Sequence, residues 1–342
     1  MKKTVFCIVA AVIACAATLS GVGCGEKSSP EMISVYAPDG APALALANVI
    51  KEQGDNGNFS FHIVDSKIIA QQVSGTHPAS DVCILPVNVA AKVLGDGQTY
   101  QMLGTVTNGN MYFLSKGTET VLTLENLKTA LMGKTVGVVQ LTNVPGLTLQ
   151  SVLRANHADY QILTNSTAAA VDKINLKPIQ DPAAEVVPVG DCDYFLCPEP
   201  LASAKVAATE EKPVSLKMSG SLQELYGGQD GYPQAVVVVK KSVIENGKQN
   251  VKQLMQAFAE SSEFLDKTPP EEVLSLLADK YTAGMTPSLN AKNLTAEVIK
   301  NCSVKFTSSA DCKDRTLEFL SRLHEIDGNV VSTVADEFFY LG

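Results

Sequence analysis

The sequence has no tryptophan, few basic residues and few charges overall. Its 342 residues contain only three arginines and four histidines, and charged residues make up 18% of the chain. The net charge is −9. Binding to nucleic-acid phosphates requires clustered Lys and Arg, and no such cluster occurs. We therefore exclude a nucleic acid as a partner.

Metal-ligating patterns are also missing. The histidines are scattered, and no cysteine pair has the CxxC spacing of a zinc site. We expect neither a metal nor any other cofactor.

Beyond the N-terminus, the chain has no apolar run long enough to cross a bilayer. The longest candidate, Ala235 to Val239, ends at Lys240 and Lys241 and predicts a buried strand. Hydrophobic residues make up 45% of the sequence, which is ordinary for a globular protein with a full core. The length suits one large two-lobed unit or two domains.

The N-terminus has the organisation of a signal peptide. Lys2 and Lys3 precede an apolar run from Val5 to about Leu19, which is shorter than the roughly 20 residues of a membrane span. Small residues follow, and the chain turns polar directly after Cys24. We therefore expect residues 1–23 to be removed.

The surroundings of Cys24 resemble a bacterial lipobox, in which the cysteine is alkylated with diacylglycerol and becomes the mature N-terminus. The resemblance implies lipidation of Cys24 and a lipid-anchored linker over residues 24–32. Gly21 departs from the pattern, which usually has Leu there. Lipidation at Cys15 and ordinary signal-peptidase cleavage remain alternatives.

Five cysteines follow Cys24, and an odd number cannot all form pairs: Cys83, Cys192, Cys197, Cys302 and Cys312. Cys302 and Cys312 flank a polar, turn-rich loop, and whether they form a disulfide is left open. The other three are expected to be small buried hydrophobic residues.

From residue 33 onward, short apolar strands alternate with helical segments, which predicts βαβ units and mainly parallel sheets. Strands are expected at 34–37, 59–64, 81–85, 111–114, 135–140, 160–163, 192–197 and 235–239. From Asn250 onward the pattern is mostly helical. The order of segments predicts two lobes joined by two crossings, with residues 33–117 plus 235–342 in lobe 1 and residues 118–234 in lobe 2.

Four segments occur in the order found in one protein family. They are APDGAPALALA (37–47), GKTVGVVQLTNVPGLTLQSVL (133–153), DYFLCPEPLASA (193–204) and YPQAVVVVKKSVIEN (232–246). Together they resemble type II solute-binding proteins of the nitrate/sulfonate/taurine and thiamine-pyrimidine-precursor kind. The resemblance implies two α/β lobes, a two-strand hinge and one ligand in the cleft.

That resemblance also implies the biological role. Such a protein captures a small solute outside the cytoplasm and delivers it to the membrane permease of a bacterial ABC importer. With a lipid anchor, this chain would be tethered to the cell membrane, and we expect it to be a monomer.

The expected ligand-binding residues follow the carboxyl ends of predicted strands, where open α/β sheets bind ligands. Two helix starts supply backbone N–H groups. The resulting candidates are Asp39, Gly40, Ala41, Ser66, Asn88, Asn143, Val144, Gly146 and Glu199. Asp39 and Asn143 also suit a role as helix N-caps only. Glu199 suits the cleft or the hinge equally.

Gly40 and Gly146 are expected to act through their backbone. A side chain at either position should obstruct a ligand and leave the fold largely intact. Asn108 and Asn110 are further hinge or cleft candidates.

We expect a binding protein and not an enzyme, because the only acids placed at the cleft are Asp39 and Glu199, one in each lobe. An exported enzyme or a sensory receptor on the same fold remains the alternative.

The solute class is open at this stage. Helix starts favour an oxyanion. The three arginines, however, lie within predicted helices, away from strand ends, and the two cleft acids favour a nitrogen-bearing solute such as a pyrimidine-like compound. Any ring stacking would come from Tyr36, Tyr112, Tyr194 or Phe195.

Overall fold

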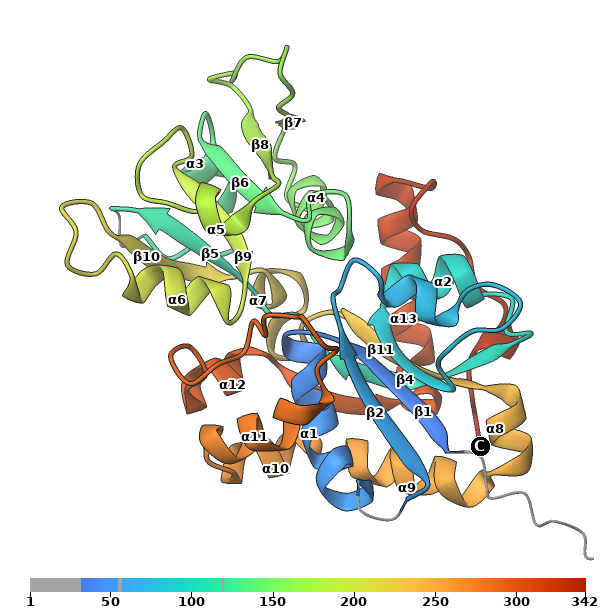
Figure 1. The fold of residues 1–342 in the computed structure, drawn as a ribbon. Coiled ribbons are helices and arrows are strands. Elements are labelled where there is room, and N and C mark those ends of the chain that lie inside the picture. The colour runs from blue at the N-terminus through green and yellow to red at the C-terminus, as the bar shows by residue number, and fades with distance from the viewer. Residues whose placement is uncertain (1–31, 55–56, 118–119) are drawn as a thin grey trace, which may run out of the picture. The chain divides into compact units, whose positions relative to one another are not determined.

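A computed structural model describes residues 32–54, 57–117 and 120–342 (Figure 1). The expected signal peptide and the lipidation site Cys24 lie outside the described residues. Residues 32–342 form one unit with two six-stranded sheets.

The first sheet has the strand order β12-β4-β11-β3-β1-β2. Its strands are β1 (Ile33–Pro38), β2 (Phe59–Val64), β3 (Val82–Pro86), β4 (Tyr100–Thr107), β11 (Ala235–Lys240) and β12 (Val304–Ser308). Strand β1 pairs in parallel with β2 and β3, whereas β11 and β12 pair antiparallel with their neighbours. The sheet therefore combines the N-terminal and C-terminal parts of the chain (Figure 1).

Helices cover both faces of the first sheet (Figure 1). They are α1 (Ala41–Gln53), η1 (Ile69–Val73), α2 (Val87–Leu94), α8 (Lys241–Asn246), α9 (Lys248–Ala259), α10 (Ser261–Lys267), α11 (Pro270–Leu277), η3 (Ala278–Lys280), α12 (Ala296–Asn301), α13 (Ser309–Ile326) and η4 (Asp336–Phe338). Strand β3 shows why both faces are apolar. Val82 and Ile84 join the core around α1, and the alternate residues Cys83 and Leu85 join the core that includes α2 and α13.

The second sheet has the order β10-β5-β9-β6-β8-β7. Its strands are β5 (Met111–Lys116), β6 (Thr135–Val139), β7 (Tyr160–Ile162), β8 (Ile174–Ile179), β9 (Tyr194–Pro198) and β10 (Leu216–Ser221). The accompanying helices are α3 (Leu127–Leu131), α4 (Val144–Ala155), α5 (Pro182–Glu185), α6 (Leu201–Ala207), α7 (Leu222–Gly227) and η2 (Gly228–Asp230). Strand β5 is antiparallel to both neighbours, so this sheet is also mixed.

Two short crossing segments, residues 108–110 and 231–234, connect the sheets. They are bonded to each other through backbone and side chains. The Tyr232 N–H donates to the Asn108 carbonyl at 3.2 Å. The Gln234 amide donates to Asn110 Oδ1 at 2.7 Å and accepts from the Asn110 N–H at 3.1 Å. Strand β5 follows the first crossing and lies in the second sheet, ahead of the lobe boundary expected at residue 117.

The cysteines of the described residues are free and buried. Burial raises the pKa of the Cys83 and Cys197 thiols to about 12, which agrees with their expected role as small apolar residues. The disulfide considered for Cys302 and Cys312 does not form, because β12 separates the two residues and each packs in a different core.

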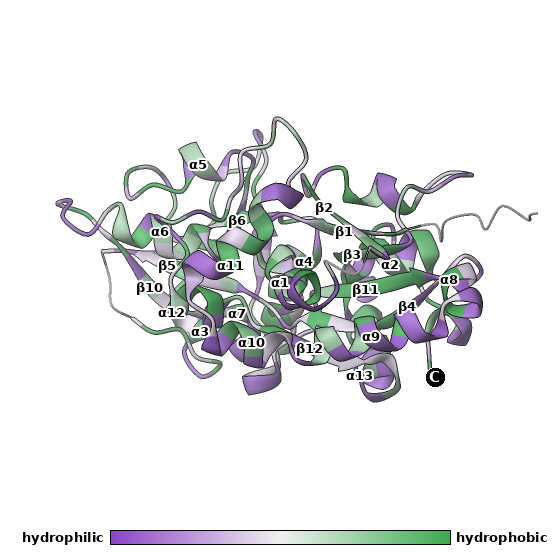
Figure 2. Ribbon diagram, turned by 60° about the horizontal axis from the view of Figure 1, so that its bottom comes forward, coloured by the Kyte–Doolittle hydropathy of each residue, from purple (hydrophilic) through white to green (hydrophobic). Residues whose placement is uncertain are grey.

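Apolar residues fill the interior of the described part. Figure 2 shows β11 as hydrophobic over most of its length, whereas α13 carries many hydrophilic residues. In the described ranges, the helices are too short or too polar to traverse a bilayer.

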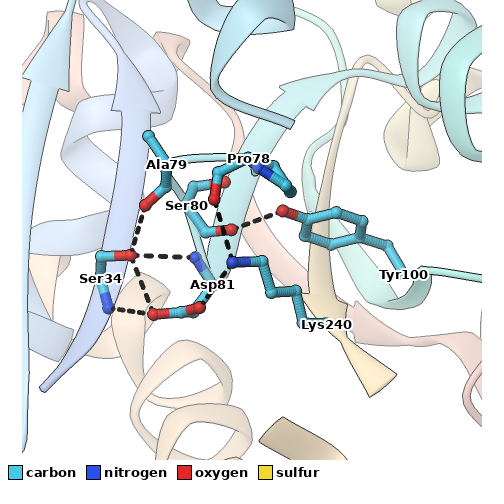
Figure 3. Close-up of polar contacts among 7 residues, drawn as sticks. All are labelled: Ser34, Pro78, Ala79, Ser80, Asp81, Tyr100 and Lys240. Atoms are coloured by element: carbon cyan, nitrogen blue, oxygen red, sulfur yellow. Dashed lines mark hydrogen bonds and ion pairs between the residues drawn. The ribbon is translucent and has the colours of Figure 1, made fainter. Parts of the chain in front are cut away.

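A polar cluster ties together three strands of the first sheet (Figure 3). Asp81, just before β3, accepts from the Ser34 N–H at 2.9 Å and forms an ion pair with Lys240 at 2.9 Å. Lys240 also donates to the Pro78 carbonyl at 3.0 Å. Ser34 is the second residue of β1 and Lys240 ends β11. The cluster therefore lies at the amino end of the parallel strands, away from the edge expected to bind ligand.

Candidate functional site

A cavity of about 890 Å³ lies where strands of both sheets end. Pro38 of β1 and Pro86 of β3 contribute from the first sheet, and Val139 of β6 and Pro198 of β9 from the second. This is the carboxyl edge of the parallel strands, where such sheets bind ligands. The volume falls within the range of small-molecule sites.

The start of α1 forms part of the cavity wall. Gly40 has φ +98° and ψ −147°, a backbone conformation open almost only to glycine. A Cβ at this position would have only Ser288 Oγ nearby, at 4.0 Å, so the backbone of Gly40 is open to the cavity. Ala41 and Pro42 continue the wall.

Asp39 holds a neighbouring loop in place. Its carboxylate accepts from the Gly40 N–H at 2.8 Å, from the Tyr281 hydroxyl at 3.2 Å and from the Ser288 N–H at 2.7 Å. Residues 284–288 of the bonded loop line the cavity, together with Asn290 and Asn293. The sequence analysis missed this loop because it lies in the helical C-terminal part and has no strand-end signal.

Glu199 lines the cavity and also links the two sheets. Its side chain accepts from Ser203 N–H at 3.0 Å, from Ser203 Oγ at 2.5 Å and from Asn301 Nδ2 at 3.2 Å. Asn301 ends α12 beside the first sheet, so the contact crosses between the sheets. Glu199 therefore lies both on the cavity lining and at a contact between the two sheets.

The crossing segments form the cavity floor through Asn110 and Gln234. Asn110 Nδ2 also donates to the Glu199 carbonyl at 3.2 Å. Asn108, the other hinge candidate, lies outside this cavity and donates to the Lys305 carbonyl at 3.1 Å.

The structure brings together five of the nine expected ligand residues and leaves four outside the lining: Asn88, Asn143, Val144 and Gly146. Asn88 is buried within α2, and its Oδ1 has no hydrogen-bond partner among the described residues. Asn143 is exposed at the start of α4 and makes no capping bond through its side chain. Only Pro145 of the α4 start lines the cavity.

Gly146 has a packing role. A Cβ there would lie 2.0 Å from the Leu141 carbonyl oxygen and 2.3 Å from Leu141 Cα. The expectation that a side chain at 146 leaves the fold intact is therefore wrong, because the β6–α4 turn folds back against this glycine.

The cavity lining is rich in proline and poor in cationic and aromatic groups. Seven prolines line it: Pro38, Pro42, Pro86, Pro145, Pro198, Pro200 and Pro287. Three carboxylates (Asp39, Asp65 and Glu199) and one ammonium (Lys67) are present, and the described lining has neither arginine nor an aromatic ring. The four aromatic residues considered for stacking lie elsewhere. Tyr36, for example, stacks on His62 at 4.6 Å between ring centroids.

A smaller cavity of about 270 Å³ lies beside the crossing segments, and Asn108 and Arg315 contribute to it. The Arg315 guanidinium donates to the Gly231 carbonyl at 2.8 Å and so holds the second crossing segment. The described residues contain no group of three or more His, Cys, Asp or Glu side chains able to hold a metal ion.

Solved structures share this arrangement over nearly the whole chain. An ABC transporter protein from Parabacteroides distasonis is 19% identical with a TM-score of 0.67, covering 90% of this chain and 98% of its own. The periplasmic aliphatic sulphonate binding protein SsuA from Escherichia coli is 14% identical with a TM-score of 0.60, covering 91% and 92%. The chain has the type II periplasmic-binding-protein fold. The periplasmic nitrate-binding protein NrtA from Synechocystis PCC 6803 shares it, at 13% identity and a TM-score of 0.55, covering 91% and 85%.

Comparisons of the sequence with family models and with curated proteins identify no family for this chain. Residues 307–323 match the family model described as the Syntaxin-5 N-terminal, Sly1p-binding domain. These residues belong to the end of β12 and to α13, whose Phe319, Leu320 and Leu323 are buried against the first sheet, so the match reflects one amphipathic helix. No curated protein matches the sequence.

Proposed function

We propose that this protein is the solute-binding receptor of a bacterial ABC importer, which captures a small organic solute between two lobes and delivers it to a membrane permease. The observation that carries the proposal is the cavity at the strand ends of both sheets, in a fold shared with proteins named for sulphonate and nitrate binding. These structural neighbours are binding proteins and not enzymes.

The site residues support binding more than catalysis. Asp39 and Glu199 each already accept three hydrogen bonds from the protein, so neither is a free acid or base. Their bonds instead fix the cavity walls before a solute arrives, which lowers the entropy cost of binding. The two crossing segments give the lobes a short hinge, and closure about it would enclose the solute.

The proposal predicts that purified protein carries its solute. Mass spectrometry of small molecules released on denaturation should detect one compound in a near-stoichiometric amount. The comparison variant is Ser66→Trp, which is designed to block the cleft. Ser66 is exposed on the cavity lining, so a large ring there fills the cleft without entering a core. The released amount should fall at least tenfold in this variant. Equal release from both proteins would place the solute outside the cleft, and chemical conversion of the compound by the protein would favour an enzyme.

We further propose that the chain is exported and tethered to the cell membrane by lipid on Cys24. The basic and apolar N-terminal segment and the small residues before this cysteine support the assignment. Cys24→Ser is expected to release most of the protein from the membrane fraction, because a serine at this position cannot carry the thioether-linked lipid. Fractionation and immunoblotting measure this, with Cys15→Ser as the control. Full retention of Cys24→Ser together with release of Cys15→Ser would move the anchor to Cys15.

A further inference from the structure

We propose that the solute is a small organic cation, a protonated amine with N–H donors on an apolar body. This inference rests on the proposed receptor function and specifies which chemistry the cleft accepts. It is carried by the charges, hydrogen-bond acceptors and apolar surfaces of the cavity lining.

The charge of the lining is negative. Asp39, Asp65 and Glu199 contribute three carboxylates, and Lys67 contributes the one ammonium among the described lining residues, which gives −3 + 1 = −2. Clefts lined by one sign of charge concentrate solutes of the opposite sign. A cation is therefore attracted to this cavity and an anion is repelled.

At each helix start, at least one of the backbone donors that an oxyanion could use is either engaged or missing. At α1, the Gly40 N–H already donates to the Asp39 carboxylate, and Pro42 has no N–H. The carboxylate itself therefore occupies the position where the helix would bind an anion. At α4, the residue that lines the cavity is Pro145, which also lacks an N–H group. The arginine clamp typical of carboxylate or sulfonate recognition is absent from the described lining.

Acceptors for an ammonium group remain available. A carboxylate oxygen can accept two hydrogen bonds. Asp39 Oδ2 accepts one, from Ser288 N–H, and Glu199 Oε2 accepts one, from Ser203 N–H. The side-chain oxygens of Asn110 and Gln234 each accept one bond within the crossing segments and so keep a second lone pair. These acceptors come from both lobes, so both walls of the cavity offer hydrogen-bond acceptors to an amine.

The remaining wall favours an apolar, non-aromatic body. Met111 and Met285 join the seven prolines of the lining. Quaternary ammonium groups are typically bound by cages of aromatic rings, and no ring is present in the described lining. The lining therefore fits an aliphatic amine, which donates N–H bonds, better than a quaternary ammonium or a stacked heterocycle.

Two exposed, oppositely charged residues on one loop allow a test in which their substitutions should change amine affinity in opposite directions. Asp65 and Lys67 both line the cavity, and the Lys67 N–H donates to Asp65 Oδ1 at 2.8 Å, a bond that the side-chain carbonyl of an asparagine could still accept. At low ionic strength, Asp65→Asn should weaken amine binding about two- to fivefold, and Lys67→Gln should strengthen it by a similar factor. Asp191→Asn is the control, because the Asp191 side chain is 90% exposed and lies outside the cavity lining.

The probes are hexylamine, 1,6-diaminohexane, hexanamide, hexanoate and hexane-1-sulfonate, measured by thermal shift and calorimetry on the full chain. We expect one or both amines to bind, with the opposite charge effects above, and the two anions not to bind. Binding of hexanoate or hexane-1-sulfonate, or no binding by either amine, overturns the proposal. The charge of the compound released from purified protein separates the two proposals. A released anion would support the receptor function and contradict the proposal that the solute is a cation. Release of no compound would count against both proposals.

Discussion

Gly146→Ala is expected to reduce the free energy of unfolding by about 3 kcal/mol or more. The added Cβ would meet backbone atoms of Leu141 at 2.0 to 2.4 Å, and backbone cannot move aside as a flexible side chain can. The same turn contains Gln140 at φ +57°, and Gln150 Nε2 donates to the Gly146 carbonyl at 3.2 Å. Relieving the clash would therefore disturb the whole β6–α4 connection.

Denaturant unfolding followed by circular dichroism measures this change. Gly227→Ala is the matched control, because Gly227 has φ −138° and a Cβ there would meet nothing within 4 Å. Its stability should stay within about 0.5 kcal/mol of the wild type. Equal midpoints for the two variants would show that the turn does not pack tightly on residue 146.

Lys240→Met is expected to lower the free energy of unfolding by about 1–3 kcal/mol, because it leaves the partly buried Asp81 carboxylate without its ammonium partner. The side chains of Lys240 and Asp81 are only 20% and 24% exposed, so solvent screens the pair less than a surface salt bridge. Lys267→Met, which removes the exposed Glu263–Lys267 pair of α10, is the control and should change stability by less than about 0.5 kcal/mol. Similar losses in both variants would argue that burial adds nothing to the Asp81 pair.

The same cluster predicts a pH dependence. Burial opposes ionisation of Asp81, but the Ser34 N–H, the Lys240 ammonium and the Ser34 hydroxyl together hold its pKa below the ordinary value of 3.8. Because the folded pKa is the lower one, the stabilisation is complete above the unfolded pKa and is lost as the pH falls through the folded value. Asp81→Asn should therefore be less stable than the wild type at pH 7, and the difference should shrink as the pH falls below about 4. A constant difference across this range would contradict the prediction.

The sequence by itself predicted the parts of the fold that depend on local pattern. Strand β2 has the expected limits because its apolar run is visible in a few consecutive residues. The alternation of strands and helices also predicted the two α/β sheets. It missed β4, β8, β10 and β12. Two of these, β4 and β12, pair with each other although they are far apart in the sequence. It also overstated the share of parallel pairing.

For the candidate site, too, local sequence patterns placed some residues and the three-dimensional fold placed the others. Asp39, Gly40, Ala41, Ser66 and Glu199 line the cavity because the residues after a strand's carboxyl end share one edge of a sheet. The sequence could not place the loop of residues 284–293, which Asp39 holds beside the cavity through the Ser288 N–H. Nor could it distinguish two glycines at helix starts. Gly40 opens onto the cavity and Gly146 packs on the chain's own backbone, because the direction of a missing Cβ is determined by how the turn folds in three dimensions.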